Sequence, residues 1–291
     1  MTAQPQTNPL VSADELEALL RDEPRPAVLD VRWALGDPDG RKHFAARRIP
    51  GSVYVDLDTE LAAEATPRAG RHPLPDPDSL QAAARRWGVS GDAGVVVLDD
   101  NGGLAAARAW WLLRWAGVTD VRVLDGGLRA WEAEGYPVDD ESAPVYQPTE
   151  GDIVLRPGQL PTLDADQTAE LARTGLLLDA RAGERYRGEV EPVDPRAGHI
   201  PGAISAPTSE NLTSDGVFRS AEELRSRFAE YGVSDAADAS SVGVYCGSGV
   251  TAAHQILALR VAGIDAALYP GSWSQWSGDP ERPAATGADR G

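Results

Sequence analysis

Residues 242–259 decide the fold, and they read Val-Gly-Val-Tyr-Cys-Gly-Ser-Gly-Val-Thr-Ala-Ala-His-Gln-Ile-Leu-Ala-Leu. The apolar run at the start predicts a buried strand, and the apolar spacing at the end predicts a helix. Between them lies a polar loop with two glycines that opens with Cys246, the only cysteine of the chain. The thiol is therefore expected where a strand of a parallel sheet ends, which is where such sheets bind ligands.

The chain repeats itself, because several segments of the first half recur in the second half in the same order. The matched pairs are 29–32 with 178–181, 48–51 with 199–202, 95–117 with 243–263, and 124–131 with 269–276. A period this long indicates duplication of a whole domain rather than a solenoid of short repeats.

Each copy alternates short apolar strands with helical segments, several of which begin with capping boxes. This alternation predicts an α/β fold in which each copy forms a mainly parallel sheet flanked by helices on both faces. We assign a first domain to residues 10–138 and a second, catalytic domain to residues 161–280. Residues 139–160 contain several prolines and few apolar anchors, so we interpret them as the linker.

Composition excludes several classes of partner. The formal net charge is −18, and phosphate binding needs clustered Lys and Arg, so we expect neither nucleic acid nor membrane as a partner. The first ten residues show no secretory signal, and we expect a cytoplasmic protein. The four histidines lack metal-binding spacing, and a single cysteine allows no multi-cysteine site, so we expect no metal.

The loop after the strand is suited to a reactive thiol. Main-chain N–H groups of the loop and the N-terminus of the following helix can surround an anion, which favours a thiolate at Cys246. Gly247 and Gly249 permit the backbone torsions that this requires, and Ser248 and Thr251 add hydroxyl groups. We therefore interpret Cys246 as a nucleophile.

Only the second copy can perform thiol chemistry. The first copy has Asp100 at the equivalent position, or Asp99 if its loop carries an extra residue. A lone cysteine after a strand can also be a small buried side chain without reactivity. The glycine-rich polar loop after Cys246 favours the reactive interpretation.

Two other loop chemistries fit less well. Residues 247–252 match the dinucleotide fingerprint G-x-G-x-x-A, but no acidic residue ends the next strand. A cysteine-dependent phosphatase needs an arginine in the loop to hold phosphate oxygens, and position 252 is alanine. We therefore expect covalent catalysis by the thiol without a cofactor.

These motifs together resemble the tandem-domain rhodaneses, the thiosulfate and 3-mercaptopyruvate sulfurtransferase family. The resemblance covers roughly residues 10–280 and includes His-Ile-Pro-Gly-Ala at 199–203, Cys-Gly-Ser-Gly-Val-Thr at 246–251 and Gly-Ser-Trp-Ser-Gln-Trp at 271–276. It implies two rhodanese-like domains with the site in the cleft between them. It also implies that Cys246 takes a sulfane sulfur from a small-molecule donor, forms a persulfide and passes the sulfur to a thiophilic acceptor. Cyanide, a small thiol and thioredoxin are the expected acceptors.

The loop also indicates the donor. Thiosulfate-type members of the family carry Cys-Arg-Lys-Gly-Val-Thr, whereas Gly247 and Ser248 replace the two cations here, as in the 3-mercaptopyruvate type. We therefore expect 3-mercaptopyruvate as the donor. The alternatives are a thiosulfate:cyanide sulfurtransferase and a non-enzymatic persulfide carrier.

The resemblance further implies which residues bind the donor. Two arginines grip its carboxylate, and the matching positions are Arg185 and Arg196. The segment between them looks longer than the family pattern, so Arg187 is a rival to Arg185. The loop residues implied to cradle the sulfur are Gly247, Gly249, Val250 and Thr251.

A serine–histidine–aspartate relay near the thiol is the last implied feature. The matching residues are Ser248, His72 and Asp58, and Asp56 is an alternative to Asp58. His72 and Asp58 lie in the first copy, so the relay would cross the domain interface. His72 would protonate the substrate or stabilise the pyruvate enolate as the C–S bond breaks.

Overall fold

The computed structural model describes residues 8–234, 237 and 239–291, and it divides the chain into two compact units. The first unit comprises residues 8–60 and Pro77–Gln159, and the second comprises Leu61–Asp76 and Leu160–Gly291. The units therefore do not follow the order of the chain. Residues 61–76, which the sequence assigns to the first domain, pack with the second unit.

The predicted linker joins the first unit almost completely. Near its end, the main-chain N–H groups of Arg156 and Gln159 donate to the carbonyls of Ala116 and Trp115 at 2.7 and 2.9 Å. These bonds fix the segment against the end of a helix. No helix among the described residues has the length and apolar character needed to cross a bilayer.

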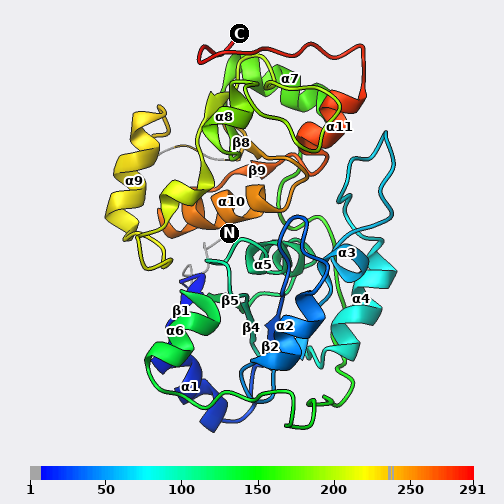
Figure 1. Cartoon of the computed structure of the whole chain (residues 1–291), viewed down its shortest axis with the longest axis vertical. Helices are drawn as coiled ribbons and strands as arrows, with labels where there is room; N and C mark the ends of the chain where they lie inside the picture. The colour runs from blue at the N-terminus through cyan, green and yellow to red at the C-terminus, as the bar shows by residue number, and fades with distance from the viewer. Residues whose placement is uncertain (1–7, 235–236, 238) are drawn as a thin grey trace, which may run out of the picture. The chain divides into compact units, whose positions relative to one another are not determined.

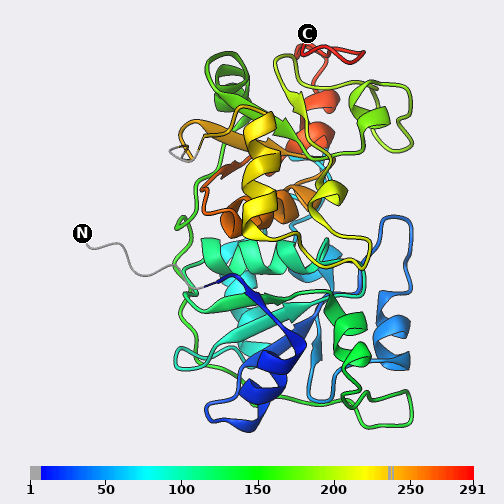
Figure 2. The same ribbon diagram turned by 90° about the vertical axis from the view of Figure 1, so that its left-hand side faces the viewer.

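The first unit is built on a parallel sheet with strand order β1-β5-β4-β2-β3 (Figure 1). Its strands are β1 (Leu10–Val11), β2 (Ala27–Asp30), β3 (Val53–Tyr54), β4 (Val95–Leu98) and β5 (Val121–Leu124). Its helices are α1 (Ala13–Arg21), α2 (Gly40–Ala46), α3 (Leu57–Glu60), α4 (Pro77–Arg86), α5 (Ala106–Trp115) and α6 (Gly127–Ala133). Leu16 of α1, Val96 of β4 and Trp131 of α6 share a buried core on one face, and α5 covers the other (Figure 2).

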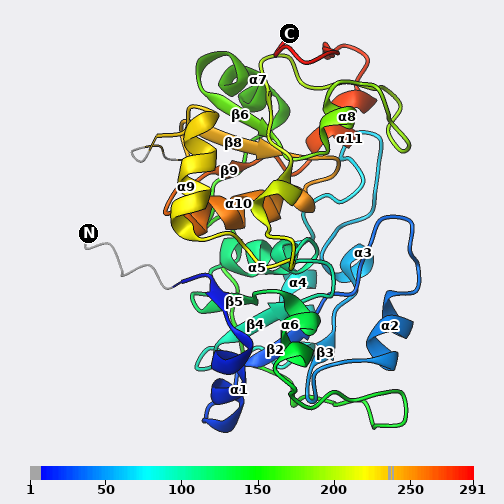
Figure 3. The same ribbon diagram turned by 60° about the vertical axis from the view of Figure 1, so that its left-hand side comes forward.

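The second unit is built on a parallel sheet with strand order β7-β6-β8-β9. Its strands are β6 (Leu176–Asp179), β7 (Ile204–Ser205), β8 (Val242–Tyr245) and β9 (Ala267–Leu268). Its helices are α7 (Ala165–Thr174), α8 (Gly183–Tyr186), the 3-10 helix η1 (Thr208–Asn211), α9 (Ala221–Glu230), α10 (Thr251–Val261) and α11 (Ser272–Gly278). α9 and α10 lie on one face of the sheet, and α7 and α11 lie on the other (Figure 3).

The two sheets confirm the predicted α/β fold and its duplication, because β5-β4-β2-β3 and β9-β8-β6-β7 have the same order.

The repeated Asp-x-Arg motif has the same role in both units. Arg32 pairs with Asp30 at 2.6 Å and donates to the main-chain oxygen of Arg47 at 2.7 Å. Arg181 pairs with Asp179 at 2.6 Å and donates to the main-chain oxygen of Gly198 at 2.7 Å. Each arginine thus ties a core strand to the turn before an Ile-Pro-Gly segment, which explains why the two motifs recur together.

Candidate active site

The register of the two sheets identifies the counterpart of Cys246 in the first unit. Leu98 of β4 and Tyr245 of β8 both pair with the last residue of the neighbouring strand. The next residue along the chain is Asp99 in the first unit and Cys246 in the second. Of the two aspartates that the sequence leaves open, Asp99 is therefore the counterpart.

The carboxylate of Asp99 shows what this loop does in the first unit. It is fully buried, and its oxygens accept four hydrogen bonds at 2.9–3.0 Å from the main-chain N–H groups of Asn101, Gly103, Ala105 and Ala106. Burial raises the pKa of Asp99, and the four N–H donors oppose that shift. The loop after this strand is thus built to surround one anionic group with amides.

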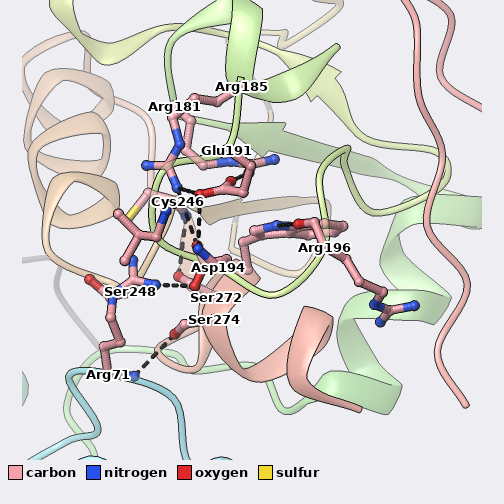
Figure 4. A network of polar contacts seen from close by, with 12 residues as sticks. Arg71, Arg181, Arg185, Glu191, Asp194, Arg196, Cys246, Ser248, Ser272 and Ser274 are labelled. Atoms are coloured by element: carbon pink, nitrogen blue, oxygen red, sulfur yellow. Dashed lines mark hydrogen bonds and ion pairs between the residues drawn. The ribbon is translucent and has the colours of Figure 1, made fainter. Parts of the chain in front are cut away.

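Cys246 occupies the same place in the second unit, between β8 and α10 (Figure 4). The residue is buried, and its Sγ accepts a hydrogen bond from the main-chain N–H of Gly249 at 3.1 Å. Gly249 has φ of 79°, a left-handed conformation that suits glycine and lets the loop turn back toward the sulfur. Val250 is buried and Thr251 begins α10, so a helix N-terminus follows the thiol directly.

The start of α11 fixes the main chain of Cys246. The hydroxyl of Ser272 accepts the N–H of Cys246 at 3.2 Å, and the N–H of Trp273 donates to the Cys246 carbonyl at 2.9 Å. Ser272 has φ of 53°, which is uncommon for a residue with a side chain. Its hydroxyl also donates to the carbonyl of Tyr269 at 2.9 Å. These bonds hold Ser272 in its strained backbone conformation and position the thiol of Cys246.

Ser248 and His72 are the two relay residues that the structure brings together. The Oγ of Ser248 and the Nδ1 of His72 are 2.7 Å apart, and both residues are buried. His72 belongs to the second unit because its segment is tied to α11, where the main-chain N–H of Arg71 donates to the Oγ of Ser274 at 3.1 Å (Figure 4). The pair can pass a proton along one hydrogen bond.

Asp58 lies in α3 of the first unit, where it accepts a hydrogen bond from the indole N–H of Trp33 at 3.0 Å. Asp56, the alternative, precedes α3 and accepts the main-chain N–H of Thr59 at 3.2 Å. Asp56 therefore has a capping role in α3.

Arg185 lies beside the catalytic loop. Its Nη1 would be 3.4 Å from a Cβ atom placed on Gly247, and its Nη2 pairs with Glu191 at 2.6 Å. Arg187, the rival position, has a side chain that is 39% exposed and pairs with Glu189 at 2.8 Å. The geometry therefore favours Arg185 as the arginine that meets a donor.

Two acids with buried side chains, Glu191 and Asp194, pair with Arg185 (Figure 4). Burial alone would raise the pKa of Glu191, but hydrogen bonds from the N–H of Asp194 and from Arg185 lower that pKa below its ordinary value. Burial raises the pKa of Asp194, and the charges of Arg71 and Arg185 offset only part of this shift.

Arg196 is held by the main chain at the end of α11. Its guanidinium donates at 2.8–3.0 Å to the carbonyls of Trp276, Ser277, Asp279 and Arg282. It points away from Cys246 (Figure 4). The role of Arg196 toward a donor carboxylate stays a prediction, and in this structure its guanidinium is occupied by main-chain acceptors. Arg196 lies three residues before His199, whose N–H donates to the carbonyl of Ala285 at 2.9 Å. This bond fixes the segment that carries Arg196 beside the C-terminal residues.

Arg71 is the site residue that the sequence analysis did not single out. Its Nη1 forms an ion pair with Asp194, and its Nη2 would be 2.9 Å from a Cβ atom on Gly247. Its position directly before His72 in the sequence could have indicated a role in the site. A charged loop residue usually lies on the protein surface, however, so this position alone did not identify it. In the described part of the chain, no group of His, Cys, Asp and Glu side chains is arranged to hold a metal ion.

Comparison with known proteins identifies the family of the chain. The model of the rhodanese-like domain matches residues 12–134 and 164–279. A Pseudomonas aeruginosa protein named "Probable 3-mercaptopyruvate sulfurtransferase" is 46% identical over 291 residues, which cover 96% of this chain and 98% of that protein. A Mycobacterium tuberculosis protein named "Putative thiosulfate sulfurtransferase SseB" is 44% identical over 283 residues, which cover 96% of this chain and 97% of that protein. The crystal structure of the 3-mercaptopyruvate sulfotransferase SseA from Escherichia coli matches with a TM-score of 0.77 and 32% identity over 92% of this chain and 99% of that chain.

Proposed function

Because the chain belongs to the rhodanese-like family and is a sulfurtransferase, we propose that it moves sulfur from 3-mercaptopyruvate to a thiophilic acceptor through Cys246. The supporting observation is the hydrogen bond from the Gly249 N–H to the Cys246 Sγ, in a loop whose counterpart surrounds the Asp99 side-chain oxygens. Amides placed in this way stabilise negative charge on sulfur, first in a thiolate and then in a persulfide.

The first half-reaction is a covalent transfer of sulfur. The Cys246 thiolate attacks the sulfur of 3-mercaptopyruvate, so that an S–S bond forms and the C–S bond breaks. The electron pair of the C–S bond passes to the carbon as the enolate of pyruvate. Protonation of that carbon gives pyruvate. The proton of the donor thiol balances this step, and the enzyme is left as the Cys246 persulfide anion.

Ser248 and His72 relay the proton in this proposal, and the proton of the donor thiol returns to His72 after the relay has protonated the enolate carbon. The hydroxyl of Ser248 is two residues from Cys246 in the chain and 2.7 Å from the Nδ1 of His72. Donation from the hydroxyl to the enolate carbon, with His72 replacing the proton, is general acid catalysis. Asp58 is our choice for the third member of the relay, since Asp56 caps α3.

Arg185 and the loop residues Gly247, Gly249, Val250 and Thr251 form the donor site in this proposal. A guanidinium binds a carboxylate through two parallel hydrogen bonds, which suits a keto acid. Thiosulfate is the second candidate donor, because a relative at 44% identity is named a putative thiosulfate sulfurtransferase. The lack of Lys and Arg within residues 246–251 favours the keto acid.

The second half-reaction returns the enzyme to its starting state. An acceptor attacks the outer sulfur of the persulfide, and the Cys246 thiolate leaves. We propose small thiols and reduced thioredoxin as acceptors, with cyanide as a laboratory substitute. We further propose a cytoplasmic location, where thiols stay reduced and the only cysteine remains available.

Mass spectrometry and steady-state kinetics test this proposal. The protein is incubated with each donor, and the mass of the only thiol is measured; we expect the gain of one sulfur atom with 3-mercaptopyruvate and none in Cys246→Ser. With cyanide as acceptor, kcat/KM should be higher for 3-mercaptopyruvate than for thiosulfate. A preference for thiosulfate would reject the donor, and a persulfide that never turns over would indicate a carrier instead.

A further inference from the structure

We propose that Thr208 and His254 are positioning residues for Cys246, because their hydrogen bond fixes the N-terminus of α10 and keeps its main-chain N–H groups directed at the sulfur. This inference rests on the proposed function, since it explains how the thiolate of that reaction is stabilised. The residues that carry it all lie within the second unit, which contains residues 160–291.

The first unit shows what holds the corresponding helix when no thiol is present. The carboxylate of Asp99 accepts the N–H groups of Ala105 and Ala106, at the start of α5, at 2.9 and 3.0 Å. The anion and the helix therefore fix each other. In the second unit the hydrogen bond to the sulfur of Cys246 comes from Gly249, which lies in the loop before α10. This bond reaches the loop rather than the helix, so the start of α10 needs a different anchor.

A capping side chain is not that anchor. The N-cap of α10 is Val250, whose apolar side chain cannot accept a hydrogen bond. By contrast, α7 and α9 of the same unit begin with capping boxes at Asp164 and Ser220. The start of α10 is therefore located by side chains within the helix.

His254 and Gln255, near the start of α10, supply these contacts. The Nδ1 of His254 lies 2.7 Å from the Oγ1 of Thr208, and the Nδ2 of Asn211 donates to the Oε1 of Gln255 at 2.8 Å. Phe218 stacks on the ring of His254 with the centroids 4.6 Å apart. Thr208 and Asn211 are the two ends of η1, and all four polar residues are buried. Two side chains of α10 are thus bonded to one short helix.

Arg227 determines the direction of these hydrogen bonds, because a guanidinium can only donate. Its Nη1 donates to the Oδ1 of Asn211 at 2.8 Å, so the Nδ2 of Asn211 donates to the Oγ1 of Thr208 at 3.2 Å. The hydroxyl of Thr208 accepts this bond and donates its own hydrogen to the Nδ1 of His254. The threonine hydroxyl is therefore the group that locates the histidine ring.

The 3-10 helix η1 is itself fixed to the strand ends beside the thiol. The main-chain N–H of Thr208 donates at 3.1 Å to the carbonyl of Ala180, the residue that follows β6. β6 pairs with β8, whose last residue, Tyr245, precedes Cys246. The same edge of the sheet thus positions the thiol directly and α10 through Thr208.

The counterparts of the two helix residues in the first unit are apolar. Counted from the first residue of α5 and of α10, Ala109 and Trp110 correspond to His254 and Gln255. All four residues are buried. The fold therefore forms with apolar side chains at both positions, and a buried polar side chain costs stability unless it is hydrogen-bonded. The polar pair accompanies the thiol, which indicates a role in its chemistry rather than in the fold.

The test compares Thr208→Val with Thr168→Val. Each replaces the hydroxyl of a buried threonine of the second unit by a methyl group, and Thr168 lies in α7, where its hydroxyl donates to the carbonyl of Asp164 at 2.6 Å. The ultraviolet absorbance of the thiolate is followed against pH, after subtraction of the matched Cys246→Ser protein. We expect the pH of half-ionisation to rise by about half a unit or more in Thr208→Val, because a helix N-terminus contributes at most about 1.5 units. Thr168→Val should leave it unchanged.

Two further variants separate positioning from a general loss of stability. Thr208→Ser keeps the hydroxyl and should restore the ionisation of the unsubstituted protein. His254→Phe keeps a flat ring against Phe218 but removes the acceptor, so it should shift the ionisation as Thr208→Val does. The guanidinium groups of Arg71 and Arg185 beside Gly247 are present in every variant, so their charges cannot cause a difference.

Several results would overturn the positioning role. They are an unchanged ionisation in Thr208→Val, an equal shift in Thr168→Val, and a shift that Thr208→Ser does not reverse. His254→Phe decides the question where Thr208→Val does not fold. The measurement does not depend on sulfur transfer, so the expected shifts in a protein that uses neither donor would support the positioning role and reject the proposed function.

Discussion

Replacing Asp99 by asparagine tests whether a buried anion organises the loop of the first unit. The carboxylate accepts two N–H groups on each oxygen, at 2.9–3.0 Å. An asparagine can accept at only one of the two positions, and its NH2 group would face the other two donors. Two buried N–H groups then lose their acceptor, at about 1–3 kcal/mol each. We expect Asp99→Asn to lower the free energy of unfolding by about 2–6 kcal/mol.

Asp100→Asn is the matched control, because it makes the same substitution at the next residue. The side chain of Asp100 is 48% exposed and accepts one hydrogen bond, from Arg32 at 3.1 Å. A partly exposed pair of this kind contributes about 0–1 kcal/mol. Urea unfolding at a single fixed pH measures both variants. Equal losses in the two variants would refute the view that Asp99 organises the loop.

Three further outcomes are expected. Ser248→Ala should lower kcat for 3-mercaptopyruvate about 100-fold, as loss of a general acid does, and an unchanged kcat would exclude its relay role. Arg196→Ala should lower the free energy of unfolding by about 3 kcal/mol, because four carbonyls lose their donor. It should change the KM for 3-mercaptopyruvate less than Arg185→Ala does. A larger change in KM for Arg196→Ala than for Arg185→Ala would place Arg196 in the donor site. The pKa of Glu191 is lowered in the folded protein, so its contribution to stability is complete above pH 4.5, the ordinary value, and is lost on acidification below it. The difference in unfolding free energy between the protein and Glu191→Gln should therefore narrow as the pH falls, and a constant difference would contradict the shift.

The features that the sequence predicts correctly all have local causes. The strand before Cys246 and the helix after it follow from an apolar run and a helical spacing within one short stretch. The duplication follows from matched motifs, and the bonds of Arg32 and Arg181 to equivalent turns show why those motifs recur. Each of these signals is contained in the residues that form the element.

The features that sequence reasoning misses depend on packing between distant segments. Nothing near His72 indicates that residues 61–76 join the second unit, because the bond of the Arg71 N–H to Ser274 links positions far apart in the chain. Motif matching alone cannot separate Arg196 from Arg71. Both are loop arginines, and only the three-dimensional arrangement shows that one is held by main-chain carbonyls and the other faces Gly247.

The two loops differ in the number of main-chain N–H groups that donate to the side chain at the start of each loop. In the first unit Asp99 presents two oxygen atoms and accepts four N–H groups. In the second unit, among the described residues, one N–H donates to the single sulfur of Cys246, although the loop starts from the equivalent point of the equivalent sheet. A persulfide carries a second sulfur atom, and its outer atom bears most of the negative charge. The loop around Cys246 is therefore matched better by the persulfide than by the thiol, since an added sulfur supplies the acceptor that the second carboxylate oxygen supplies in the first unit.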